Sequence, residues 1–338
     1  MTRAGVLAVD GGNSKTDVAL VNADGSVLAL VRGALSSPQH LGVDGALAVV
    51  DGLLGEALRD AQLGDGAGRV AQVATLLMAG VDFPAEEDAV RIAVEQRGWA
   101  QSVHVGNDTF AVLRAGTELG WGVAVTCGAG INCVGVGPDG RHARFPALGA
   151  ITGDWGGGYD LGLAAVSAAA RSEDGRGPRT TLERAVPAHF GVTTPSDLAE
   201  GIHTGRIDQR RVIELAPLVL AEAADDAVAA EIVQHLASEV VALARVALTR
   251  LELTQEPVEV LLGGGVLQDV DGDLLAAIDS GLREAAPNVT VRPTASAAIV
   301  GAALLGLDEL EAGPEAQARL RRELGAAFSQ LEGAATVG

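Results

Sequence analysis

Aromatic residues, lysines and cysteines are all scarce in this chain of 338 residues. Aromatic side chains make up 3% of the sequence, and the 24 basic residues include a single lysine, Lys15. Two cysteines, Cys127 and Cys133, are too few for a disulfide framework, and their spacing matches no common zinc pattern. A disulfide-stapled domain and a structural zinc domain are therefore not expected.

The chain also lacks a long apolar run and an excess of positive charge. Its first apolar stretch, residues 4–9, is short and is interrupted by Asp10, which does not fit a signal peptide. No uninterrupted apolar segment reaches the roughly 18 residues that a membrane helix needs. The net charge of −20 disfavours nucleic acid, whose binders usually carry a basic face. We therefore expect a soluble, cytoplasmic protein with no membrane or nucleic-acid partner.

Apolar residues and glycines are abundant. The chain is 48% hydrophobic, has a mean hydropathy of +0.27 and contains 45 glycines, which is typical of a compact globular protein with many tight turns. Hydrophobic cores stop growing near roughly 250–300 residues, so the length fits one large or two medium domains. The acidic surface says little about the substrate, because negative charge is a common solubility device.

The two halves of the chain open with the same order of elements. The first half is expected to form three strands over residues 5–9, 17–21 and 27–31. The second half repeats them over residues 121–126, 132–136 and 141–145. In both halves an Asp-Gly pair joins the second strand to the third, and Asp-Gly between apolar runs is a strong hairpin signal.

Helices and strands then alternate in each half. The first half continues with helices over residues 43–61, 86–97 and 108–116 and strands over residues 73–79 and 102–105. The second continues with a helical stretch over 159–253, helices over 274–285 and 296–307, and strands over 258–262 and 289–292. This order predicts an α/β protein with duplicated lobes, each a mixed sheet flanked by helices, and an interlobe cleft.

Lys15 lies in the turn of the first hairpin, Val9-Asp10-Gly11-Gly12-Asn13-Ser14-Lys15-Thr16-Asp17. Two glycines let the backbone pass close to a ligand and point its amides at it, which suits phosphate oxygens. The carboxylate of Asp10 could hold the water shell of a magnesium ion. The segment predicts a nucleotide-phosphate loop, and the alternative is an ordinary hairpin turn.

Asp108 follows the expected strand 102–105 within Asn107-Asp108-Thr109. A hydroxyl that attacks a phosphoryl group needs a proton acceptor within hydrogen-bond reach, and Asp108 could be that acceptor. Equally, Asp108 could only cap the helix that follows it, which is a common role of aspartate. The residues alone leave both interpretations open.

Three further glycine motifs follow in the second half: Cys127-Gly128-Ala129-Gly130-Ile131-Asn132, Gly153-Asp154-Trp155-Gly156-Gly157-Gly158 and Leu261-Leu262-Gly263-Gly264-Gly265-Val266. With the first two motifs, their order resembles the sugar-kinase, heat-shock-protein and actin superfamily of ATPases. Within it the chain looks most like the N-acetylglucosamine kinases and the BadF/BadG/BcrA/BcrD ATPase group, over nearly its whole length. The resemblance implies two ribonuclease-H-like (actin-like) lobes, which we expect at residues 1–117 and 118–312. A terminal helix at 313–338 is expected to pack on the first lobe.

The resemblance implies a role for each motif. Asp108 is the expected catalytic base, and Asp10 is expected to hold Mg²⁺ through water. The phosphates of ATP are expected to contact Gly11, Gly12, Asn13, Ser14, Lys15, Thr16, Gly128, Ala129 and Gly130. The adenine is expected to lie against Gly263, Gly264 and Gly265. The sugar is expected to contact Gln39, His40, Gly80, Asn107, Asp108, Asn132, Asp154 and Trp155.

Two of these motifs depart from the family's usual residues. Cys127, Ala129 and Ile131 stand where the family usually has hydroxyl residues around the glycines, so backbone amides remain but side-chain donors are missing. Trp155 replaces a glutamate beside Asp154. Its flat ring could stack on a sugar, or it could simply fill space in the core.

The remaining sugar contacts also have plain alternatives. The kinases place a sugar-binding asparagine in the loop that corresponds to residues 36–40, and that asparagine is absent here. Gln39 or His40 could substitute for it, but His40 could equally be a surface histidine. Gly80, at the end of an expected strand, could belong to a turn with no further role.

The function expected from these residues is ATP- and Mg²⁺-dependent phosphorylation of a sugar, most of all the 6-hydroxyl of N-acetylglucosamine or a related amino sugar, by a homodimer. One alternative is a reductase-activating ATPase with a bridging iron–sulfur cluster, which needs exposed cysteines. Both cysteines here lie in or beside the second glycine hairpin, where a cluster would block the nucleotide. Another alternative is a sugar- or nucleotide-sensing regulator, whose DNA-binding module would precede the first loop.

Overall fold

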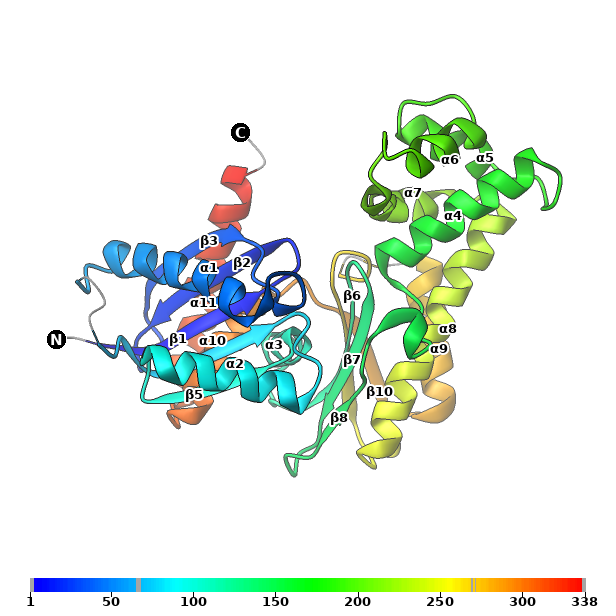
Figure 1. Cartoon of the computed structure of the whole chain (residues 1–338). Coiled ribbons are helices and arrows are strands. Elements are labelled where there is room, and N and C mark those ends of the chain that lie inside the picture. The colour runs from blue at the N-terminus through cyan, green and yellow to red at the C-terminus, as the bar shows by residue number, and fades with distance from the viewer. Residues whose placement is uncertain (1–2, 65–67, 269, 271, 336–338) are drawn as a thin grey trace. The chain divides into compact units, whose positions relative to one another are not determined.

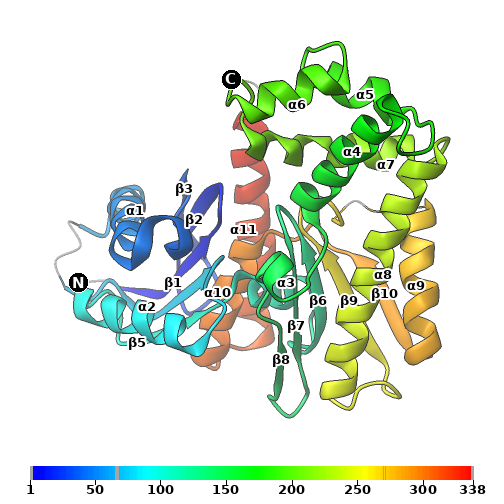
Figure 2. The same cartoon turned by 45° about the vertical axis from the view of Figure 1, so that its right-hand side comes forward.

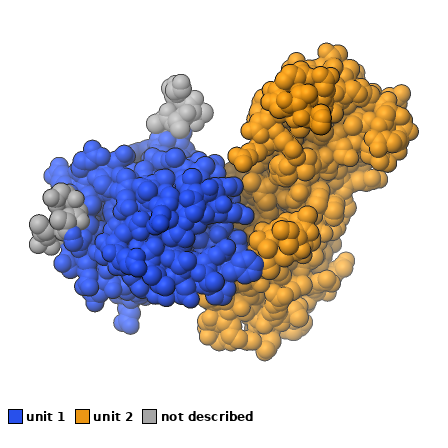
Figure 3. All heavy atoms as spheres, in the orientation of Figure 1, with its two compact units in different colours: residues 1–121, 296–338 blue, residues 122–295 orange. Residues whose placement is uncertain are grey.

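The computed structural model describes residues 3–64, 68–268, 270 and 272–335, and Figures 1 and 2 show the course of the chain. The chain divides into two compact units, which Figure 3 shows in different colours. Unit 1 comprises residues 1–121 together with 296–338, and unit 2 comprises residues 122–295. The chain therefore passes from one unit to the other twice.

Unit 1 is built on a five-stranded mixed sheet with the strand order β3-β2-β1-β4-β5. Its strands are β1 (Ala4–Gly11), β2 (Lys15–Val21), β3 (Val27–Ala34), β4 (Ala71–Met78) and β5 (Ser102–Gly106). The first three strands form two antiparallel hairpins, whereas β1, β4 and β5 are parallel to one another. The parallel pairs need crossover connections, and helices supply them.

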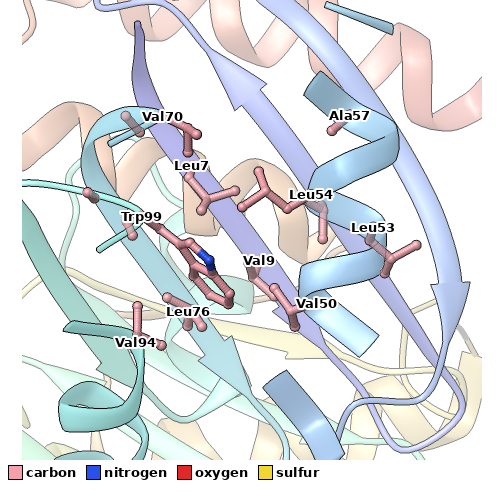
Figure 4. Packing of buried hydrophobic residues seen from close by; sticks show 14 of the residues in the cluster. Leu7, Val9, Val50, Leu53, Leu54, Ala57, Val70, Leu76, Val94 and Trp99 are labelled. Carbon is pink, nitrogen blue, oxygen red and sulfur yellow. The ribbon is translucent and has the colours of Figure 1, made fainter. Parts of the chain in front are cut away.

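Three helices accompany this sheet: α1 (Pro38–Asp60), α2 (Pro84–Arg97) and α3 (Asp108–Gly116). Residues of α1 and α2 share one core with alternate residues of the strands, such as Leu7 and Val9, because successive side chains of a strand point to opposite faces. Figure 4 shows Leu54 of α1 and Trp99, just after α2, packed in this core. A kink at Gly42, where φ is 68° and ψ is 168°, separates the first turn of α1 from its body.

The opposite face of the sheet is closed by two helices near the end of the chain, α10 (Ala298–Glu309) and α11 (Pro314–Ala335). The hydroxyl of Thr75 donates to the carbonyl oxygen of Ala302 at 2.7 Å and ties α10 to β4. A Cβ atom on Gly301 would lie only 1.8 Å from the carbonyl oxygen of Ala111 in α3. Glycine at this position therefore lets α10 cross α3 with backbone against backbone.

This packing differs from the boundary that we expected at residue 312. α10 falls in unit 1, because its small residues fit against β1, β4 and α3 of that unit. The second passage between the units accordingly lies at residues 295–296. The terminal helix α11 lies in unit 1 as well, with Leu320 and Leu324 buried in the same core as Val6 and Ala8.

Unit 2 repeats the architecture of unit 1. Its five-stranded sheet has the order β10-β9-β6-β7-β8, with β6 (Gly122–Cys127), β7 (Ile131–Val136), β8 (His142–Arg144), β9 (Val258–Gly263) and β10 (Val289–Pro293). Two antiparallel hairpins are again followed by parallel pairs, β6 with β9 and β9 with β10. The predicted duplication of a mixed sheet flanked by helices is confirmed.

The long helical stretch of unit 2 consists of η1 (Gly149–Ile151), α4 (Gly157–Glu173), α5 (Leu182–His189), α6 (Pro195–His203), η2 (Gln209–Leu215), α7 (Ala216–Glu222) and α8 (Ala227–Arg250). α9 (Gly272–Ala285) follows β9 and packs against α8. By length and composition α8 could cross a membrane, but Leu236, Val240 and Leu248 are buried and the helix contacts β6 and β7. We therefore interpret α8 as a core helix of unit 2.

The crossing of α10 over α3 gives a test of the fold. Gly301→Ala should lower the free energy of unfolding by about 1–3 kcal/mol, the usual cost of overpacking a filled site. Gly325→Ala in α11 is the matched control, because a Cβ atom there would meet nothing within 4 Å. Denaturant titration should show Gly301→Ala destabilised and Gly325→Ala unchanged or slightly stabilised. Equal stability of the two variants would contradict the close crossing.

Candidate active site

The first glycine hairpin, between β1 and β2, is held by backbone contacts on both sides. The N–H of Gly12 donates to the carbonyl of Lys15 at 2.9 Å and closes the turn. The N–H of Ala79, after β4, donates to the carbonyl of Gly11 at 2.8 Å, and that of Ser36, after β3, donates to the carbonyl of Gly12 at 3.3 Å. The hairpin is therefore a fixed feature at one edge of the sheet of unit 1.

Three charged side chains form a row across β1, β2 and β3 beside this hairpin. Asp10 pairs with Asp17 in the sheet register and Asp17 pairs with Arg32, which places the three on one face. Arg32 binds both carboxylate oxygens of the buried Asp17, at 2.7 and 2.9 Å. Burial, followed by the charges of Asp108 and Asp17, raises the pKa of Asp10 to about 8. A further cation beside Asp10 would lower this pKa and favour the ionised carboxylate.

Asp108 is the first residue of α3, and its neighbour Asn107 is the residue that caps this helix. The Asn107 Oδ1 accepts a hydrogen bond of 2.9 Å from the N–H of Thr109. Burial raises the pKa of Asp108 to about 6, although the N–H groups of Thr109 and of Asp108 itself lower it. At neutral pH Asp108 is mostly ionised and still basic enough to accept a proton.

Residues expected on the sugar side lie after β4 and β5 and at the start of α1. A Cβ atom on Gly80, where φ is 75°, would lie 2.8 Å from the Cβ atom of Gln39, so these two residues are neighbours. Two residues further, Asp82 accepts a hydrogen bond of 2.8 Å from the side-chain amide of Asn107. Gln39 and His40 are exposed. Unit 1 thus brings Gln39, Gly80 and Asn107 to the loops around Asp108.

Lys15, expected to bind phosphate, contacts the C-terminal helix in this structure. Its Nζ lies 3.0 Å from Oε1 of Glu332 in α11, 317 residues further along the chain. Its ammonium also lies 5.6 Å from the centre of the Phe328 ring. Nothing in the local sequence around the hairpin indicates this partner.

In unit 2 the second glycine hairpin, residues 128–130, contacts the other two glycine motifs of that unit. A Cβ atom on Gly157, where φ is 84°, would lie 2.5 Å from the carbonyl oxygen of Ala129. A Cβ atom on Gly264, where φ is 82°, would lie 2.5 Å from the carbonyl oxygen of Cys127. Both positions need glycine, because the backbones touch. Three motifs that are far apart in the sequence therefore meet at one edge of the sheet.

Trp155 lies just before α4, and its ring stacks on His235 of α8. The two ring centres are 4.0 Å apart and the planes are inclined by 18°. Trp155 is half-buried, so it is not a core tryptophan, and a sugar ring could stack only on the face opposite His235. The neighbouring Asp154 accepts a hydrogen bond from the Thr152 hydroxyl, and the Asn132 Oδ1 accepts one of 2.7 Å from the N–H of Cys133.

A cavity of about 590 Å³ lies in unit 2 beside the Gly263–Gly265 turn, between α7, α8 and α9. Its lining is mainly apolar and includes Ala216, Leu220, Ala237, Gly265, Val266 and Leu274. Gln234 and Asp273 add a side-chain amide and a carboxylate. Ligand sites of this size are typically apolar with a few polar groups that fix orientation. A flat heterocycle with hydrogen-bonding edges suits this lining.

The burial of the cysteines and the positions of possible metal ligands limit which metal sites this structure can form. Cys127 and Cys133 are fully buried, and burial raises the pKa of the Cys127 thiol to about 12. Neither thiol is exposed for a cluster shared between subunits. Within residues 3–64, 68–268, 270 and 272–335, no group of three or more His, Cys, Asp or Glu side chains could hold a metal ion.

Several residues enter the site that the sequence analysis did not assign to it: Asp17, Arg32, Asp82, Gln234 and Asp273. A sequence signal existed for Asp17 and Arg32, which carry opposite charges: Asp17 begins the predicted strand 17–21, and Arg32 directly follows the predicted strand 27–31. Asp82 follows Gly80 closely and could also have been found. The two residues of the cavity, Gln234 and Asp273, lie on the helices α8 and α9, and nothing in the sequence around them indicates a ligand.

The model of the BadF/BadG/BcrA/BcrD ATPase family matches residues 7–306. The N-acetylmuramic acid/N-acetylglucosamine kinase of Clostridium acetobutylicum is 27% identical over 267 residues, which are 79% of this chain and 86% of that protein. The N-acetyl-D-glucosamine kinase of Dictyostelium discoideum is 25% identical over 316 residues, which are 91% of this chain and 99% of that protein.

A solved structure provisionally named as an N-acetylglucosamine kinase, from Chromobacterium violaceum, matches with a TM-score of 0.69 and 25% identity. The match covers 90% of this chain and 99% of that one, so it includes both sheets. The family model likewise spans every glycine motif described above and both half-sites. The chain therefore belongs to the BadF/BadG/BcrA/BcrD ATPase family.

Proposed function

We propose that this protein transfers the γ-phosphoryl group of ATP to the 6-hydroxyl of an amino sugar, with N-acetylglucosamine as the leading candidate. The observation that carries the proposal is the half-buried carboxylate of Asp108, with a raised pKa, in the same unit as the glycine hairpin between β1 and β2. The two curated kinase relatives support the same reaction and substrate class.

Asp108 would act as the general base. Its carboxylate is mostly ionised above about pH 6, so it can take the proton of the sugar hydroxyl as oxygen attacks the γ-phosphorus. The bond from phosphorus to the sugar oxygen forms while the bond to the β-phosphate oxygen breaks, and ADP leaves with that electron pair. Asn107 and Asp82 would fix the position of the base through the cap of α3.

Mg²⁺ suits the surroundings of Asp10. Three carboxylates, those of Asp10, Asp17 and Asp108, face two cations, the guanidinium of Arg32 and the ammonium of Lys15, so a further positive charge is favourable here. Asp10 would hold the ion through water, since magnesium keeps much of its hydration shell. When bound, the ion would neutralise charge on the phosphate oxygens during transfer.

The adenine of ATP would occupy the 590 Å³ cavity of unit 2, against the Gly263–Gly265 turn. Gln234 can both donate to and accept from a purine edge, and Asp273 can accept from ribose hydroxyls. The second hairpin, residues 128–130, would offer backbone amides to the phosphates. We also propose that the protein is cytoplasmic and forms a homodimer.

The sugar is identified by a substrate panel. ADP release with Mg-ATP should be fastest with N-acetylglucosamine among glucose, glucosamine, N-acetylglucosamine, N-acetylmannosamine and N-acetylmuramic acid. The phosphorus spectrum of the product should show a phosphate ester at carbon 6. A rate of ADP release that no sugar increases would refute sugar kinase activity.

Asp108→Asn should lower the rate of sugar-dependent ADP release about 10²-fold or more, because the general base is lost.

Asp108→Asn should also stabilise the protein at high pH. A raised carboxyl pKa means that folding favours the protonated form, and this contribution is lost as the pH rises from about 4 to about 6. The variant should therefore exceed the wild type in melting temperature by more at pH 8 than at pH 5.

Asp44→Asn serves as the control for Asp108→Asn, because that carboxylate is almost entirely exposed. It should change neither turnover nor the pH dependence of the melting temperature. Near-normal turnover of Asp108→Asn would rule out the base, whatever its stability.

Ala277→Met should weaken ATP and ADP binding by about tenfold or more, or roughly 1.4 kcal/mol, because Ala277 lines the cavity and a larger side chain fills it. Ala276→Met, on an exposed position of the same helix, is the matched control. Calorimetric titration of both variants with ADP should separate them. Unchanged affinity of a folded Ala277→Met protein would place the purine elsewhere.

A further inference from the structure

One carboxylate oxygen of the C-terminal helix accepts hydrogen bonds from two cations of the phosphate-hairpin region. Oε1 of Glu332 lies 3.0 Å from Nζ of Lys15 and 3.3 Å from Nη1 of Arg32. The two donors come from β2 and β3, and the acceptor from the last turns of α11. An anion-binding site has the same arrangement, in which two cations converge on one anionic oxygen.

The two cations are held in place by different means. Arg32 is fixed by the buried Asp17, which binds its Nε and Nη2 and leaves Nη1 directed to Glu332. The ring of Phe328 lies 4.7 Å from the Arg32 guanidinium and 5.6 Å from the Lys15 ammonium. The two cations therefore share one aromatic ring and one acceptor, and they are held together before any ligand binds.

The Glu332 carboxylate is the replaceable part of this arrangement. The side chains of Lys15 and Glu332 are 47% and 49% exposed, whereas that of Asp17 is 1% exposed. Exposed ion pairs contribute little to stability, so exchanging this carboxylate for another anion costs little. The rest of α11 stays anchored without it, through the buried Leu320 and Leu324.

We propose that Lys15 and Arg32 form a phosphate-oxygen site of the nucleotide, and that Glu332 is an internal anion that occupies it until the nucleotide binds. This inference rests on the proposed function, since it takes the β1–β2 hairpin as a phosphate loop. It adds Arg32 as a phosphate-binding residue and makes the end of α11 a competitor of ATP. Lys15 cannot donate the same hydrogen bond to Glu332 and to a phosphate, and the two anions repel each other.

The choice of phosphate follows from position and charge. Lys15 is the first residue of β2, directly after the hairpin turn, and the N–H of Gly12 donates to its carbonyl at 2.9 Å, so Lys15 adjoins the glycines. A nucleotide phosphate carries more negative charge than the single carboxylate that it would displace. Arg guanidinium groups also match the geometry of phosphate oxygens well.

The test is calorimetric titration of the full-length protein with ADP and with adenosine, in 50 mM and 500 mM sodium chloride. Glu332→Gln removes the competing charge and should bind ADP about two- to fivefold more tightly at low salt, with most of the gain lost at high salt. Adenosine, which has no phosphate, should bind equally to both proteins. Glu315→Gln, the same change in the first turn of α11, should match the wild type.

The Lys15→Met variant tests whether the tighter ADP binding of Glu332→Gln depends on the Lys15 ammonium. It should weaken ADP binding about tenfold or more, and adding Glu332→Gln to it should restore less than twofold. Arg32 itself is left intact, because replacing it would leave the buried Asp17 without its partner and endanger folding.

The outcomes separate this inference from the proposed function. If Lys15→Met weakens ADP binding but Glu332→Gln behaves like the wild type, the competition does not exist and the proposed kinase stands. An equal gain for adenosine, or an undiminished gain in the Lys15→Met background, also refutes the anion site. If Lys15→Met leaves ADP affinity unchanged, Lys15 does not contact the phosphates and this inference fails, whereas the proposed kinase activity is decided separately by the sugar panel.

Discussion

Direct contact between backbones, without room for a Cβ atom, is the constraint on which both units depend. In unit 1, Gly301 allows α10 to cross α3. In unit 2, Gly157 and Gly264 bring two loops against the hairpin after β6. Each contact joins segments that are far apart in the sequence, so the glycines determine the architecture as well as the turns.

The second constraint is the charge enclosed in unit 1. Asp10 and Asp108 have raised pKa values, first because of burial, and for Asp10 also because Asp108 and Asp17 lie near it. Burying carboxylates in this way is unfavourable for folding unless a cation or a proton joins them. Strongly perturbed carboxylates cluster at functional sites for this reason. The proposed base, Asp108, and the proposed cation-binding residue, Asp10, therefore come at a cost in folding stability.

Much of the fold could be predicted from the sequence because its signals are local. Alternating apolar residues, Asp-Gly turns and glycine motifs define the strands, and both expected sheets form. The site residues that sequence analysis assigned are carried by these same local motifs. What it missed depends on contacts between distant segments. The partner of Lys15 lies 317 residues away, Trp155 stacks on a helix 80 residues further on, and the cavity appears only when α7, α8 and α9 pack together.

The double passage of the chain between the units has a consequence for biosynthesis. Unit 2 is one continuous segment, residues 122–295, whereas unit 1 is completed only by residues after 295. Until α10 and α11 leave the ribosome, the sheet face that carries Val6, Ala8 and Ala19 is covered only in part, by α3. Domains generally fold as units during synthesis. The first part of unit 1 is synthesised before unit 2, but it cannot complete its fold until residues after 295 have been made. Unit 2 can therefore fold before unit 1.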